Sequence, residues 1–236
     1  MSRPDADGNS VSVNDLVLVQ GMKDTKLTLR RWNERPLGIF GPWVAISFAI
    51  AVALLSAVWL IATLSPPDIT GLLVPGVVRE PESGDYLYVL TLHAFACVAG
   101  FIAGSSIPLS AAHRSGVDRW IHEKAGRFAI LFVICATTFS LVTQAYVLGG
   151  DASTISSQLG ISPGMLVLAI LPHAIPELTA LFLPLAAWLI ASRRDRWDEL
   201  LAATFVTVGA AIPVLLLSGV IELWVSPQIM RSLAGS

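Results

Sequence analysis

The chain has 236 residues, of which 54% are hydrophobic and only 14% are charged. Soluble domains are about 45–50% apolar and about 25% charged, so this composition excludes an ordinary soluble protein and indicates an integral membrane protein with several spans. The formal net charge of −2 gives no reason to expect a nucleic-acid partner.

The first 40 residues are predicted to form a cytoplasmic, partly disordered tail. Residues 1–12 are polar, so no cleavable signal peptide is expected there. Residues 13–35 mix apolar and basic positions, which fits either a short amphipathic segment on the membrane surface or a basic flank that fixes topology. Residues 41–230 are expected to form the transmembrane helical domain.

Five apolar runs are each long enough for the roughly 20 residues that a spanning helix needs. They are residues 42–64, 86–109, 125–148, 164–191 and 200–225. The fourth run is over-long and contains Pro172, Pro176 and Pro184, so we expect it to tilt or kink. Gly149 and Gly150 are interpreted as a chain reversal after the third run. We therefore predict an all-α, polytopic membrane helical bundle of about five transmembrane helices.

Basic residues alternate between the segments that connect these runs. Lys and Arg are frequent before the first run, in residues 110–124 and in residues 192–199, whereas residues 65–85 contain one and residues 149–163 contain none. The positive-inside rule then places the N-terminus in the cytoplasm and the C-terminus on the extracytoplasmic side.

A set of polar side chains interrupts the apolar runs. It consists of His93, Gln144, His173, Glu177 and Glu222. A charge at the centre of a membrane helix costs at least about 2.5–3.5 kcal/mol, so such residues need partners or a polar surrounding. The predicted orientation puts all five in the outer half of the bilayer, where they could converge on one cluster. His173 and Glu177 lie one helical turn apart, which lets Glu177 accept a hydrogen bond from an imidazole N–H.

Three interpretations of this cluster stay open. The residues could simply link helices through hydrogen bonds, or they could line a pathway for a substrate, a lipid or protons. In the third interpretation His93, His173 and Glu177 bind zinc for hydrolysis, although a lone His-x-x-x-Glu lacks the His-Glu-x-x-His spacing of zinc proteases. No catalytic residue is assigned, and no cofactor is expected.

Small residues indicate close helix packing in the second run. Gly100 and Gly104 form a Gly-x-x-x-Gly pattern, which favours packing within the chain and, as a second interpretation, contact in a homodimer. Cys97 and Cys135 lie inside apolar runs and are interpreted as small buried hydrophobic residues.

Two segments resemble a known family. Residues 171–178, Leu-Pro-His-Ala-Ile-Pro-Glu-Leu, resemble the leucine-proline-histidine-glycine-then-glutamate signature of the stage II sporulation protein M family. Residues 218–227 resemble the last span of that family, which ends in isoleucine-glutamate and closes with a proline. Ala174 stands where the family usually has glycine, and Gln144-Ala145 stands where asparagine-glycine is expected. The resemblance covers about residues 86–230.

The resemblance implies a multi-pass protein of the bacterial inner membrane. The family's namesake is a membrane scaffold for peptidoglycan-remodelling enzymes in spore formation, and the family is not known as a set of enzymes. We therefore expect a non-enzymatic membrane subunit or scaffold that assembles or anchors a cell-envelope or membrane complex, with the lipid bilayer and other membrane or envelope proteins as partners. The alternatives are a permease-like subunit whose 110–124 segment couples to a partner ATPase, and an intramembrane metal-dependent hydrolase.

Overall fold

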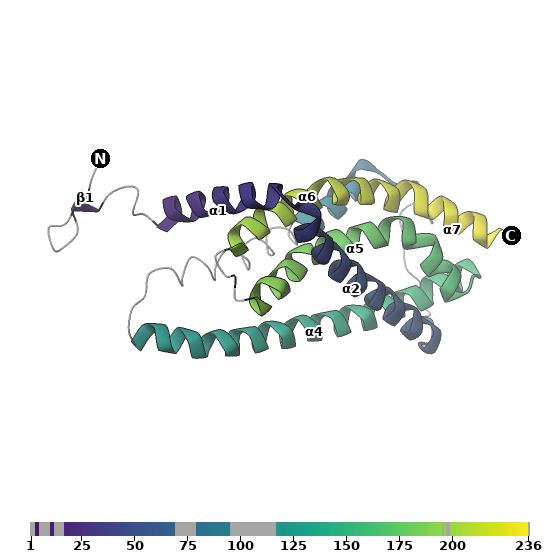
Figure 1. Cartoon of the computed structure of the whole chain (residues 1–236). Coiled ribbons are helices and arrows are strands. Elements are labelled where there is room, and N and C mark those ends of the chain that lie inside the picture. Colours follow the sequence, from purple (N-terminus) through teal and green to yellow (C-terminus); the bar gives the residue numbers. More distant parts are fainter. Residues whose placement is uncertain are drawn as a thin grey trace.

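The computed structural model describes the secondary structure of residues 3–4, 10–11, 17–68, 79–94, 117–194, 196 and 199–235, and the side chains of residues 25–68, 79–94, 131, 134–194, 196 and 199–235. Two short strands, β1 (Arg3–Pro4) and β2 (Ser10–Val11), pair near the N-terminus. The helices are α1 (Val17–Asn33), α2 (Pro36–Leu64), α4 (Val117–Leu159), α5 (Pro163–Arg193), α6 (Leu200–Val220), the π-helical turn η3 (Ile221–Val225) and α7 (Ser226–Ala234) (Figure 1). Residues 83–94 are also helical. The predicted helical fold class is confirmed.

Three of the described helices are long and apolar enough to cross a membrane: Pro36–Leu64, Pro163–Arg193 and Leu200–Ala234. They contain the first, fourth and fifth predicted runs. The third predicted run lies inside α4. Residues 86–94 of the second run are helical, and the rest of that run lies outside the described residues. The total of five spans and the sides of the two termini remain predictions.

Prolines mark where two of the long helices begin. Pro36 and Pro163 occupy the start of α2 and α5, where a missing backbone N–H costs nothing because the first turn has no helical acceptor for it. Ser162 caps α5, since its side chain accepts a 3.2 Å hydrogen bond from the Met165 N–H. The helix then continues through its three internal prolines to Arg193. In lipid the backbone has no water to bond, which favours keeping the remaining helical hydrogen bonds.

The predicted reversal at Gly149 and Gly150 is wrong, because α4 runs through both residues to Leu159. The first of these glycines lies where α4 approaches α2, and a Cβ on Gly149 would lie only 2.6 Å from the Cβ of Ile61. The chain turns instead at Gly160, whose φ of 67° is a left-handed conformation that glycine adopts without steric cost. Gly149 is thus a packing residue and Gly160 is the turn residue.

The end of α4 also holds the segment that follows α2. The Ser153 hydroxyl donates a 2.7 Å hydrogen bond to the Ser65 carbonyl, and the Thr154 hydroxyl accepts one of 2.9 Å from the Asp68 N–H. Ser153 and Thr154 are both buried. These bonds satisfy backbone groups just beyond the last turn of α2, where intrahelical partners run out.

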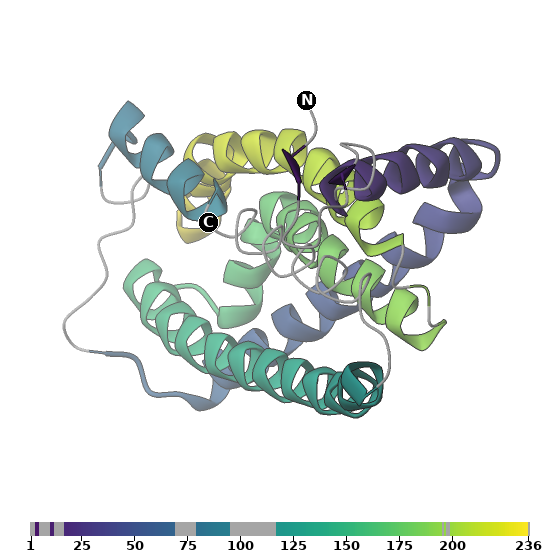
Figure 2. The ribbon, with the colours of Figure 1, turned by 90° about the vertical axis from the view of Figure 1, so that its left-hand side faces the viewer.

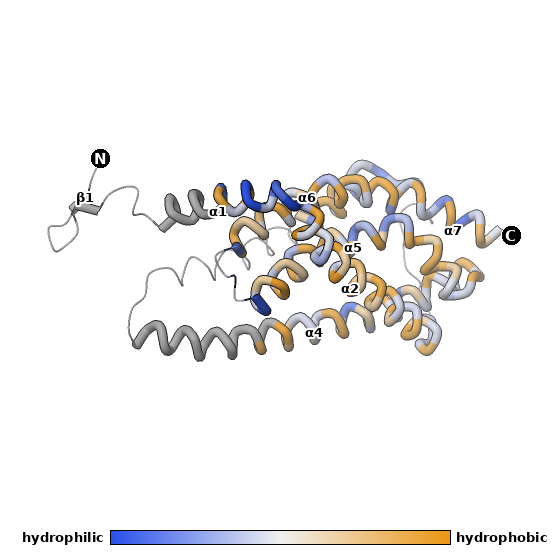
Figure 3. Tube along the Cα trace, in the orientation of Figure 1, coloured by the Kyte–Doolittle hydropathy of each residue, from blue (hydrophilic) through white to orange (hydrophobic). Residues whose placement is uncertain are grey.

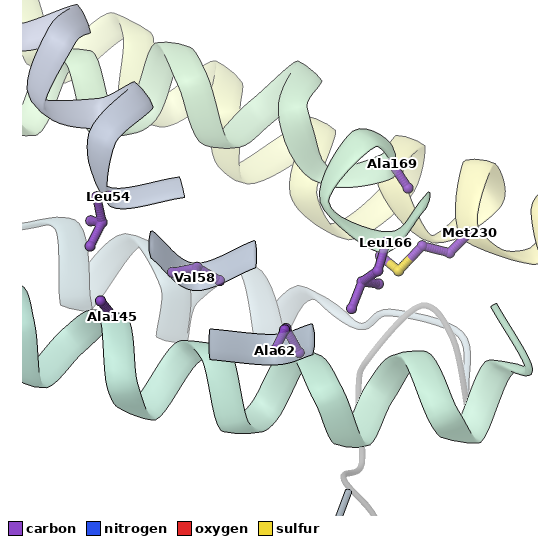
Figure 4. Packing of buried hydrophobic residues seen from close by; sticks show 8 residues of the cluster. Leu54, Val58, Ala62, Ala145, Leu166, Ala169 and Met230 are labelled. Atoms are coloured by element: carbon purple, nitrogen blue, oxygen red, sulfur yellow. The ribbon is translucent and has the colours of Figure 1, made fainter. Parts of the chain in front are cut away.

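The centre of the bundle is α5, which contacts α2, α4, α6 and α7. One hydrophobic cluster joins α2, α4, α5 and α7 and includes Val58, Ala145, Leu166 and Met230 (Figure 4). Many large apolar side chains stay exposed, such as Phe139 on α4 at 74%. Helices that are apolar on their outer faces as well are typical of membrane spans. Cys135 is exposed on α4, so its predicted burial is wrong.

Candidate intramembrane polar site

The helix at residues 83–94 is fixed against the C-terminal part of the chain, as Figure 2 shows. The Tyr86 hydroxyl donates a 3.0 Å hydrogen bond to the Leu216 carbonyl, and the Tyr86 ring meets the ring of Trp224 edge to face at 5.9 Å. Gly219 leaves room for this contact, because a Cβ there would lie 3.2 Å from the Tyr86 ring. These contacts position the last turn of the helix, which carries His93, beside α5.

An ion pair lies at the start of the same helix. The Arg79 guanidinium donates two hydrogen bonds to the Asp85 carboxylate, of 2.9 and 2.6 Å, and the Glu82 N–H donates a third of 2.8 Å. The Arg79 bonds first, and the Glu82 N–H second, hold the pKa of Asp85 below its ordinary value. This carboxylate therefore orders the turn that leads into the helix.

The lowered pKa of Asp85 predicts how the ion pair depends on pH. A carboxyl group with a depressed folded-state pKa stabilises the fold above its unfolded pKa of about 3.9, and this contribution is lost as the pH falls through the folded value. We expect Asp85→Asn to lower the melting temperature slightly at pH 7, since the pair is exposed, and we expect this difference to shrink as the pH falls toward 3. Melting curves between pH 7 and pH 3, with Glu80→Gln as control, test this. A difference that persists undiminished at pH 3 contradicts it.

A polar contact joins His93 to Glu177 of α5. The Nε2 atom of His93 lies 3.0 Å from Oε1 of Glu177. Only 8% of His93 is exposed, and its Nδ1 atom is buried with no hydrogen-bond partner in the described part of the protein. The contact links two segments that are 84 residues apart in the sequence.

His173 bonds to a different helix. Its Nδ1 atom lies 2.7 Å from the Ser226 hydroxyl at the start of α7, and both residues are buried. The expectation that Glu177 pairs with the imidazole one turn away on α5 is therefore not met: Glu177 pairs with His93, and His173 pairs with Ser226. Two side chains at i and i+4 share a face of one helix, but each contacts whichever neighbouring helix lies opposite it.

Glu222 lies in a π-helical turn. The Ser226 N–H donates to the Ile221 carbonyl five residues back, in place of the usual four. Pro227 follows, and a proline lacks the N–H and clashes with the carbonyl four residues earlier, which favours the wider turn. Glu222 is half-buried and lies near His93. The proline after the isoleucine-glutamate pair was the sequence signal for this turn, and Ser226 is the partner that sequence reasoning missed.

The structure does not join every predicted residue to this site. Gln144 is exposed on α4, and its amide donates a 3.2 Å hydrogen bond to Ser140 of the same helix. Gly100 and Gly104 lie outside the described residues. Among the described side chains there is no group of three or more His, Cys, Asp and Glu residues that could hold a metal ion. The geometry thus brings together two pairs, His93–Glu177 and His173–Ser226, with Glu222 nearby.

Comparison with known families matches residues 125–227 to the family described as Stage II sporulation protein M. No curated protein and no solved structure matches the chain. The matched region ends at Pro227 and contains His173, Glu177, Glu222 and Ser226, whereas His93 precedes it. The resemblance that the sequence motifs indicate is therefore confirmed.

Proposed function

We propose that the protein is a non-enzymatic membrane subunit that assembles or anchors a complex of the cell envelope. The premise is the match of residues 125–227 to the stage II sporulation protein M family. The observation that carries the proposal is the pairing of the buried polar side chains between helices. Each of the two intramembrane histidines has a protein partner on another segment. Such bonds orient helices relative to one another, and each is worth about 0.6 kcal/mol on average in a membrane.

The length of α4 supports a role in holding partners. A helix of 43 residues is about 65 Å long at 1.5 Å per residue, whereas the hydrocarbon core of a bilayer is about 30 Å thick. Even a tilted helix of this length extends beyond the hydrocarbon core. The sequence before the predicted span carries charges of both signs at Asp118, Arg119, Glu123 and Lys124. A regular helix that extends beyond the membrane offers a docking surface to another membrane or envelope protein.

Cross-linking in cells followed by purification of the tagged full-length chain tests the proposal. We expect one peptidoglycan-remodelling or other envelope protein to co-purify in a fixed ratio. Arg119→Ala combined with Lys124→Ala should lower its yield by about fivefold or more, the effect of losing roughly 1 kcal/mol of binding free energy. Arg231→Ala, which removes an exposed charge from α7, serves as the control and should leave the yield unchanged.

Two outcomes would favour the alternatives. Co-purification of an ATPase in a fixed ratio, with ATP-dependent transport in vesicles, would support the permease-like subunit. Of its coupling segment at 110–124, residues 110–116 lie outside the described residues and residues 117–124 belong to α4. Hydrolysis of an envelope substrate by the purified chain alone, lost in Glu177→Gln, would overturn the non-enzymatic proposal.

A further inference from the structure

A pocket lies at the end of the bundle where α1 meets the three apolar helices. The start of α2, the end of α5, the start of α6 and the last turn of α1 line this pocket, whose volume is about 390 Å³ when the open solvent at its mouth is included. The lining is apolar on the α2 and α5 sides and charged at the rim. The lining residues include Trp32, Ile39, Pro42, Arg194, Arg196 and Glu199.

An indole N–H in this pocket has no acceptor. Trp32 is only 3% exposed, and its Nε1 atom is buried without a hydrogen-bond partner in the described part of the protein. The ring is held edge to face by Trp43 at 5.2 Å and by Phe40 at 6.3 Å, so it is rigidly placed. A buried donor without an acceptor costs about 1–3 kcal/mol, and a ligand that accepts this hydrogen bond recovers that free energy.

Among the side chains that the structure describes, the rim of the pocket carries one arginine without a salt bridge. Arg196 forms a salt bridge with the buried Glu199, so these two charges offset each other. Arg194 is exposed, and among the described side chains no carboxylate forms a salt bridge with it. The nearby exposed residues Arg30 and Arg31 at the end of α1 extend the positive potential. The pocket therefore combines a neutral donor with a cation, which suits an anionic ligand.

The position of the pocket indicates what kind of anion can reach it. All three apolar helices begin or end here, at Pro36, Arg193 and Leu200, so the pocket lies at the level where the spans leave the membrane. Figure 3 shows the most hydrophilic stretch of α1 beside the start of α6 at this end of the bundle, in agreement with the contact between these two helices. A phospholipid places its phosphate at this depth and its acyl chains along the apolar helix surfaces.

We propose that this pocket binds an anionic phospholipid. The phosphate accepts the Trp32 N–H and is neutralised by Arg194, while the glycerol and the first acyl carbons pack on Ile39 and Pro42. The apolar wall favours a lipid over free phosphate, and the extra positive charge favours an anionic headgroup over a zwitterionic one. This inference does not depend on the proposed function.

Lipid titration of the purified full-length protein tests the site. The probe is phosphatidylglycerol added to phosphatidylcholine–detergent micelles, with bound lipid counted by native mass spectrometry and stability followed as melting temperature. We expect one tightly bound phosphatidylglycerol and a rise in melting temperature. Trp32→Phe, which keeps an aromatic ring and removes the N–H, should weaken binding about fivefold, and Arg194→Gln should weaken it about tenfold.

Arg35→Gln is the matched control, because it removes an exposed positive charge at the same end of the bundle from a residue that does not line the pocket. An equal loss of affinity in Arg35→Gln and Arg194→Gln would overturn the proposal, since binding would then follow diffuse charge. The absence of a tightly bound phosphatidylglycerol would overturn it too. If 10 mM inorganic phosphate gave the same stabilisation with the same sensitivity to Trp32→Phe, the ligand would be a soluble anion and the assignment to a lipid would be wrong.

Discussion

Gly149→Ala is expected to destabilise the protein by about 1–3 kcal/mol, the usual effect of forcing extra volume into a packed interface. A Cβ at this position would lie 2.6 Å from both the Cβ and the Cγ2 of Ile61, and 3.2 Å from the Val58 carbonyl oxygen. The contact atoms belong to the backbone and to a stiff β-branched side chain, so α2 and α4 must move apart. The free energy of unfolding in lipid–detergent micelles measures the effect.

The neighbouring glycine provides a matched control. Gly150 also lies in α4, and a Cβ there would meet nothing within 4 Å. Gly150→Ala should therefore be neutral or stabilise the helix by up to about 1 kcal/mol, because alanine loses less backbone entropy than glycine. If both alanine variants destabilise equally, the close approach of α2 and α4 at residue 149 is not present in the membrane.

Glu177→Leu and His93→Leu are each expected to destabilise the protein by about 1–3 kcal/mol, and the double variant is expected to cost clearly less than their sum. Each single change leaves a buried polar partner without a hydrogen bond, whereas the double change removes both groups of the 3.0 Å contact. A double-mutant cycle on the free energy of unfolding measures the coupling.

Gln144→Leu is the control for this cycle. Gln144 is exposed, and its amide bonds to Ser140 of the same helix, so its loss should change stability by less than about 0.5 kcal/mol. Additive effects of His93→Leu and Glu177→Leu would show that the two residues do not interact. A double variant that regains stability and still loses its co-purifying partner would assign the pair a role beyond linking helices.

Residue spacing predicted the positions of individual helices in this protein and the polar residues within them. The apolar runs located α2, α5 and the C-terminal helix, and the polar interruptions identified four of the residues that the structure brings into or beside the site. These features depend on periodicity and length, which each segment carries by itself. The segments 171–178 and 218–227 also indicated the family whose model matches residues 125–227.

Predictions from residue spacing were wrong where the structure depends on which helix lies opposite a residue. Gly149 and Gly150 look alike in the sequence, yet only the first faces another helix closely. The two glycines were therefore interpreted as a turn, although α4 continues through them because a buried close approach also requires glycine. Gln144 was placed in the polar cluster by depth alone, whereas rotation about the helix axis turns it outward.

The sequence by itself indicated a helical membrane protein that resembles the stage II sporulation protein M family, because composition and local spacing are properties of the chain. Only the tertiary structure decided that Glu177 contacts His93 and that His173 contacts Ser226. It also decided that the Trp32 indole and the Arg194 guanidinium line one pocket. The physical reason is that each helix presents several faces, and packing between segments far apart in the sequence selects which face meets which neighbour.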